Sequence, residues 1–88
     1  MKMAKNKRLV CYSAVWCGPC KMFKPILREL TNEGYDVQVV DIDQNPHIAQ
    51  ANKIFGVPTS VVYDKENREI ERLQGVRTKE DLVRILSA

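Results

Sequence analysis

The sequence predicts an α/β protein in which a four-stranded mixed sheet is flanked by three helices, in the order β-α-β-α-β-β-α. Short runs of β-branched and other apolar residues alternate with segments of helical period. A helix separates the first two strands, which should pair in parallel through a right-handed crossover. A short polar turn joins the last two, which should be antiparallel. At 88 residues, 44% of them hydrophobic, we expect residues 1–88 to form a single domain.

The amino-terminal half of the chain should contain a strand, a long helix and a second strand. Residues 8–13 (RLVCYS) and 37–42 (VQVVDI) have the composition of strands. Residues 20–31 between them have helical period and end before a glycine. The apolar stripe of this helix consists of Phe23, Ile26, Leu27 and Leu30. Pro25 lies inside the helix and should kink it.

A second helix should start at Asn45 and Pro46, which form a capping signal, and run to about Lys53. We expect its inner side to carry Ile48, Ala51 and Phe55. This helix would return the chain to the sheet.

The carboxy-terminal part should contain a hairpin and a last helix. Residues 60–63 and 68–73 are strand-like segments joined by a polar turn, with Ile70 and Leu73 as apolar positions of the second strand. Thr78 should cap the last helix, with Asp81 three residues on, close to a capping box. The apolar residues of this helix are Leu82, Val83, Ile85 and Leu86.

Composition excludes several classes of function. The formal net charge of +3 is too small to indicate nucleic acid as the main partner, and we expect residues 1–6 to be a flexible basic terminus. No stretch approaches the roughly 20 apolar residues of a membrane span. No apolar secretory core follows the first charged residues. We therefore predict a cytoplasmic protein that binds neither nucleic acid nor membrane.

Cys17 and Cys20 carry the strongest chemical signal. Thiol–disulfide exchange needs a thiolate that attacks and a second thiol that resolves the mixed disulfide. Cys17 should lie at the start of a helix, where the helix dipole lowers the pKa of its thiol below the free value of about 8.5. Cys20 should lie one turn further in, more buried and protonated. Gly18 permits the tight turn between them, and Pro19 suits a first helical turn.

At these residues the chain resembles the thioredoxin family. Residues 16–21 (WCGPCK) are similar to the family's active-site motif. Further matches follow in order at Pro25, residues 41–46 (DIDQNP), residues 56–59 (GVPT) and Gly75. The resemblance extends from about Leu9 to Leu86, and it implies a thioredoxin-like fold.

The resemblance also implies an activity. A thioredoxin-type enzyme would reduce protein disulfides, with Cys17 as nucleophile and Cys20 as resolving thiol. Pro58 should be cis and face the cysteine pair, so that the backbone of Val57 is free to pair with an extended substrate. The residues expected to contact substrate are Trp16, Gly18, Pro19, Val57, Pro58 and Gly75.

The partners expected from the resemblance are protein disulfides and a thioredoxin reductase. No cofactor should bind this chain. The disulfide formed between its two active cysteines would be reduced again by the flavin-dependent reductase, which uses NADPH. We expect the chain to act as a monomer.

Two positions depart from the family's pattern. Thioredoxins often carry a buried aspartate six residues before the first active cysteine, where this chain has Cys11. They often pair that aspartate with a lysine in the next strand, where this chain has Val39. Without the carboxylate we expect slower deprotonation of Cys20. The chain also resembles a minimal, glutaredoxin-sized core without the family's extra amino-terminal strand and helix.

Three alternatives remain at this point. A structural zinc site needs four ligands. Besides the Cys-x-x-Cys pair, only Cys11 and His47 are available, and neither lies in a motif with the spacing of zinc ligands. We therefore expect no metal. Cys11 fits a core position and His47 a surface one. A glutathione-linked, glutaredoxin-like enzyme would share this fold. A non-catalytic subunit could use the surface between Trp16 and Pro58 to hold a partner.

Overall fold

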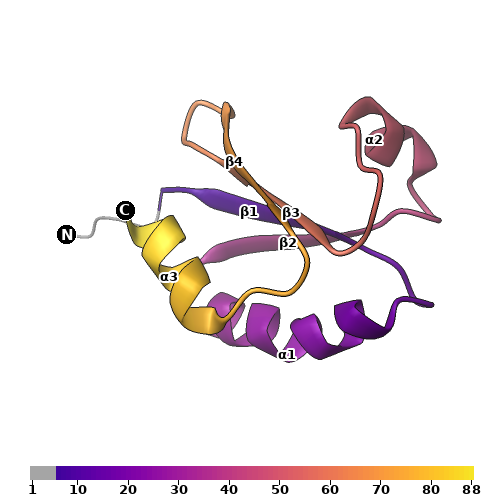
Figure 1. Ribbon diagram of the computed structural model, residues 1–88. Coiled ribbons are helices and arrows are strands. Elements are labelled where there is room, and N and C mark those ends of the chain that lie inside the picture. The colour runs from indigo at the N-terminus through magenta and orange to yellow at the C-terminus, as the bar shows by residue number, and fades with distance from the viewer. Residues whose placement is uncertain (1–5) are drawn as a thin grey trace.

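The computed structural model describes residues 6–88 and has the predicted order of elements (Figure 1). The elements are β1 (Arg8–Ser13), α1 (Gly18–Asn32), β2 (Asp36–Asp41), α2 (Pro46–Ala51), β3 (Thr59–Tyr63), β4 (Glu69–Gln74) and α3 (Lys79–Ser87). Residues 1–5, most of the predicted basic terminus, lie outside the described residues. Asn6 is exposed.

The sheet is mixed, as predicted. Its strand order is β2-β1-β3-β4, with β1 and β2 parallel and the other two pairs antiparallel. Figure 1 shows α1 and α3 side by side on one face of the sheet and α2 on the other. The protein is therefore the expected α/β structure, with β1 at the centre and its carboxyl end leading into α1.

Hydrophobic side chains cover both faces of the sheet. On the face packed by α1 and α3, the buried residues are Leu9, Cys11, Phe23, Leu27, Leu30, Val62, Leu73, Leu82 and Leu86. On the face toward α2, Val10, Tyr12 and Val61 are buried, and Ile42 and Ile54 pack against them. Alternate residues of β1 thus point to opposite faces, as the two-residue period of a strand requires.

The α1 helix begins at Gly18 with Cys17 as its cap, so Cys17 lies at the start of the helix as predicted, two residues before the stretch of helical period begins. Its predicted apolar stripe is confirmed, since Phe23, Leu27 and Leu30 are buried and Ile26 packs against them. Gly34, with φ 95°, follows the end of the helix. A glycine in this left-handed conformation is the usual way for a helix to stop. Pro25 lies inside the helix, and the kink expected there stays a prediction.

The prediction for α2 was wrong in length and in orientation. The helix ends at Ala51, because Lys53 adopts a left-handed conformation (φ 57°) and the N–H of Ile54 donates to the carbonyl oxygen of Ala49 at 3.0 Å. This pattern is a Schellman-type end, which turns the chain sharply after the helix. Ala49 is the buried residue of the helix, and Phe55 is 92% exposed.

The remaining elements differ from prediction by small shifts. In β4, Leu73 is buried as expected, but Ile70 is exposed and has no partner on β3, where the register shifts between Val62 and Tyr63. Thr78 caps α3 by accepting a hydrogen bond from the backbone N–H of Asp81, as predicted. Within residues 6–88, no helix has the length and hydrophobicity to cross a membrane.

Candidate functional site

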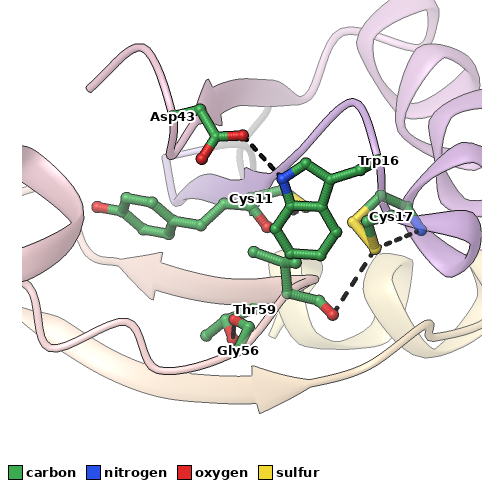
Figure 2. The surroundings of a disulfide bond; sticks show 9 residues. Cys11, Trp16, Cys17, Asp43, Gly56 and Thr59 are labelled. Carbon is green, nitrogen blue, oxygen red and sulfur yellow. Dashed lines mark hydrogen bonds between the residues drawn. A yellow bond between two sulfur atoms is a disulfide. The ribbon is translucent and has the colours of Figure 1, made fainter. Parts of the chain in front are cut away.

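The candidate site lies where β1 ends and α1 begins. A disulfide joins Cys17 and Cys20, whose Cα atoms are 5.3 Å apart (Figure 2). The loop that carries them is closed by a hydrogen bond from the backbone N–H of Cys17 to the carbonyl oxygen of Ala14, at 3.2 Å. Both cysteines are buried, Cys17 at 5% exposure and Cys20 at 2%. A single turn of chain thus brings two sulfur atoms together at the edge of the core.

The sulfur of Cys17 takes the place of a helix-capping oxygen. The backbone N–H of Cys20 donates to Cys17 Sγ at 3.2 Å, and the backbone of Cys17 is extended (φ −91°, ψ 114°), as at an ordinary N-cap. Residues 18–21, the first turn of α1, include Lys21 and no carboxylate. The partial positive charge of the helix end is therefore directed at this sulfur without a competing anion on that turn.

A second loop approaches the same sulfur. The peptide bond between Val57 and Pro58 is cis, as the resemblance predicted. The carbonyl oxygen of Val57 lies 3.7 Å from Cys17 Sγ, so a reduced Cys17 thiol can donate to it (Figure 2). The N–H of Val57 has no hydrogen-bond partner within residues 6–88. The N–H of Val57 therefore remains available as a hydrogen-bond donor near Cys17.

The cis-proline loop is held on both sides. The hydroxyl of Thr59 donates to the carbonyl oxygen of Gly56 at 2.6 Å. The N–H of Gly75, which has φ 81°, donates to the carbonyl oxygen of Pro58 at 2.9 Å. The segment after β4 is thereby fastened to the loop that faces Cys17. The predicted site residues thus lie on three loops that meet, around residues 16–20, 57–58 and 75.

Trp16 is fixed in orientation although its side chain is 64% exposed. Its indole Nε1–H donates to Asp43 Oδ2 at 2.8 Å, across the end of the sheet (Figure 2). Asp43 is itself placed by a turn, since its backbone N–H donates to Asp41 Oδ1 at 2.8 Å. Sequence reasoning assigned Asp43 no role. The available signal was its place in residues 41–46, the segment that resembles the family and ends β2.

Cys11 lies in the core of the sheet, as predicted, and is a free cysteine. It pairs with Val39 on β2 and with Ser60 on β3. Burial raises the pKa of its thiol, and the nearby Ser60 hydroxyl offsets this effect only in part. No hydrogen bond of ordinary geometry joins the two, and Ser60 Oγ has no partner within residues 6–88.

Within residues 6–88, no three or more His, Cys, Asp or Glu side chains gather where they could hold a metal ion. His47 is exposed near the start of α2, as the sequence predicted.

Comparisons with known proteins agree with this geometry. The Thioredoxin family model matches residues 1–88. A thioredoxin of Staphylococcus aureus is 36% identical, over 97% of this chain and 84% of its own length. One from Staphylococcus epidermidis is 34% identical, over 97% and 84%.

A solved structure supports the same assignment. A mutant thioredoxin from Halobacterium salinarum NRC-1 superposes with a TM-score of 0.85 at 29% identity, covering 93% of this chain and 73% of its own. Its fold matches the four-stranded mixed sheet and three helices described above. This chain therefore belongs to the thioredoxin family of protein-disulfide oxidoreductases, and its disulfide-forming cysteine pair is that of a thiol–disulfide oxidoreductase.

Proposed function

We propose that this chain reduces disulfides of protein substrates through its Cys-Gly-Pro-Cys site. The Cys17 thiolate attacks one sulfur of a substrate disulfide, forms a mixed disulfide and releases the other sulfur as a thiolate, which takes up a proton. Cys20 loses its proton and attacks Cys17 Sγ, which releases the second substrate thiol. Two electrons thereby pass from the dithiol to the substrate, and the Cys17–Cys20 disulfide remains.

The hydrogen bond to Cys17 Sγ is the observation that carries this proposal. In the dithiol state, the same Cys20 N–H at 3.2 Å and the end of α1 favour a negative charge on the sulfur. Such surroundings lower the pKa of a cysteine thiol and raise the fraction present as thiolate at neutral pH. Cys17 also lies between two exposed residues, Trp16 and Gly18, which leaves the chain on either side of it open to a substrate.

The position of Cys20 suits the resolving role. Its backbone spacing from Cys17, 5.3 Å between Cα atoms, is within the range that a disulfide bridges. At 2% exposure it has little access to a second substrate, so its reaction is directed at Cys17. Gly18 and Pro19 are exposed between the two cysteines and leave the approach to Cys17 open.

Substrate binding is proposed to use the cis-proline loop and the indole surface. The N–H of Val57 would donate a hydrogen bond to a carbonyl oxygen of an extended substrate segment, which would pair with the loop as an added strand. Trp16 would cover the attached segment with a flat apolar surface, held by Asp43. Pro58 and Gly75 would complete the wall of the site through the hydrogen bond that joins them.

The electron donor in this proposal is a flavin-dependent thioredoxin reductase that uses NADPH. It would return the Cys17–Cys20 disulfide to the dithiol, and this chain itself would bind no cofactor. Function as a monomer and in the cytoplasm also stays a prediction from the sequence.

Insulin reduction tests the proposal. The chain is supplied with thioredoxin reductase and NADPH in one assay and with glutathione alone in a second, and a Cys17→Ser, Cys20→Ser double variant serves as the control. We expect turnover only with the reductase and only in the unsubstituted chain. Turnover with glutathione alone would instead indicate a glutaredoxin-like enzyme. If the double variant keeps the biological activity of the chain, a binding role replaces the proposed catalysis.

A further inference from the structure

Phe55 is the most exposed of the large apolar side chains in residues 6–88, at 92%. Burying a phenylalanine side chain stabilises a fold by about 1.5–3 kcal/mol, and this position forgoes nearly all of that gain. The reason is local: the turn after α2 directs Ile54 into the core, so the next side chain faces outward. Single exposed apolar residues are common on proteins, so the surroundings of Phe55 decide what its exposure means.

Phe55 lies two residues before Val57, whose carbonyl oxygen is 3.7 Å from Cys17 Sγ. Two residues of chain span at most about 7 Å, so the Cα of Phe55 lies within about that distance of the Cα of Val57. Other exposed apolar residues adjoin the segments that meet at this site. Val15 and Trp16 directly precede Cys17, and Val76 follows Gly75, which is bonded to Pro58.

The backbone around Phe55 is held in place and open to an incoming chain. The N–H of Ile54 is bonded to Ala49 before it, and the carbonyl oxygen of Gly56 accepts the Thr59 hydroxyl after it. A Cβ atom placed on Gly56 would meet no other atom within 4 Å, so the space between Phe55 and Val57 is free. An apolar side chain on such a fixed backbone binds a partner without a large loss of conformational entropy.

We propose that Phe55 is a specificity-determining residue, which contacts an apolar side chain of the substrate two or three residues from its reactive cysteine. The inference rests on the proposed function and deepens it. A substrate segment paired with Val57 rises about 3.3 Å per residue, so about two residues cover the distance to Phe55. Protein substrates with leucine, methionine or an aromatic residue at that spacing are therefore reduced faster than those with a small polar residue.

Symmetric disulfide dimers of a short peptide test this inference. One dimer carries Leu and the other Ser at the second and third positions on both sides of its cysteine. The chain is first reduced, and oxidation of its cysteine pair in a single turnover is followed by alkylation trapping and mass spectrometry. We expect the Leu dimer to react about fivefold faster, which corresponds to about 1 kcal/mol.

Three variants separate Phe55 from a general apolar effect. Phe55→Ser should bring the Leu-to-Ser rate ratio close to one, and Phe55→Leu should keep most of it. Ile70→Ser is the matched control, because Ile70 is also exposed but lies at the far end of β4 from Gly75, and it should leave the ratio unchanged. An unchanged ratio in Phe55→Ser, or equal rates of both dimers with the unsubstituted chain, overturns the inference.

Hydroxyethyl disulfide distinguishes a failure of the inference from a failure of the proposed function. This reagent is too small to reach from Cys17 to Phe55, so every variant should react with it at the same rate. If the unsubstituted chain reacts with hydroxyethyl disulfide but shows no preference between the dimers, only the role of Phe55 is rejected. If it reacts with no disulfide at all, the proposed function and the inference are rejected together.

Discussion

Cys11 lies in β1 within the sheet and Cys17, six residues later, lies at the N-cap of α1, and both are almost fully buried. Their surroundings are nevertheless opposite. The sulfur of Cys17 receives a backbone N–H at the start of α1, whereas the thiol of Cys11 is enclosed by apolar side chains and burial raises its pKa. Burial alone therefore does not distinguish the two sulfur atoms. We expect the donors directed at each sulfur to set its reactivity.

The largest difference between the two cysteines should appear in activity. We expect Cys17→Ser to lower the rate of insulin reduction by about 10³-fold or more, because the attacking sulfur is lost. Cys11→Ala should keep the rate within about twofold, since Cys11 lies in the core and is not joined to the redox pair. A loss of activity in Cys11→Ala without a loss of stability would show that the comparison is wrong.

A carboxylate at position 11 should change both the stability of the chain and the rate at which Cys20 reacts. Cys11→Asp places an ionisable group in the core, and we expect it to lower the free energy of unfolding by about 2–4 kcal/mol. The unpartnered hydroxyl of Ser60, across the strand pair, can donate to the new carboxylate and limit this loss. The same change should speed the resolution of the mixed disulfide by Cys20, because a nearby base would accept its proton.

Urea unfolding measures the first effect of Cys11→Asp, and stopped-flow kinetics near neutral pH measure the second. Cys11→Ser is the control, since it adds polarity at the same position without a base. An unchanged resolution rate in Cys11→Asp would refute the role assigned to the carboxylate.

A smaller effect is expected in the pH dependence of stability. The thiol of Cys11 ionises at about pH 8.5 in the unfolded chain and at higher pH in the folded one. Above the unfolded value the folded state binds more protons, so the free energy of unfolding falls as the pH rises, by at most about 1.4 kcal/mol per pH unit. We would measure the free energy of unfolding of the unsubstituted chain and of Cys11→Ala in urea at a series of pH values. The two plots against pH should be parallel near neutral pH and diverge in alkali. Curves that stay parallel throughout would contradict the assigned shift.

Much of this fold was predictable from local sequence. The order of elements and the mixed sheet follow from helical and strand periods, and the start of α1 follows from Cys17 and from Pro19 two positions later. The orientation of α2 was not predictable in this way. A six-residue helix makes fewer than two turns, and the direction of the chain after it depends on Lys53, which takes a left-handed conformation usually left to glycine.

In the candidate site, too, some features were predictable from local sequence and others were not. The cysteine pair and the cis-proline loop are recognisable from two short motifs. The bond between Trp16 and Asp43 joins residues 27 positions apart and depends on how two loops meet at one end of the sheet. The exposure of Phe55 likewise depends on which of two neighbouring apolar residues the turn directs inward. The sequence pattern places Phe55 on the inner side of α2 and assigns no place to Ile54.

The pH dependence of alkylation in the fully reduced chain is the most direct test of the central claim. Iodoacetamide labelling is followed at each cysteine by mass spectrometry. We expect Cys17 to react with a midpoint below about pH 8.5, the value of a free thiol, and Cys11 to stay unlabelled until urea unfolds the chain. A midpoint for Cys17 equal to that of a free thiol, or labelling of Cys11 at the same rate in the folded chain, would contradict the account.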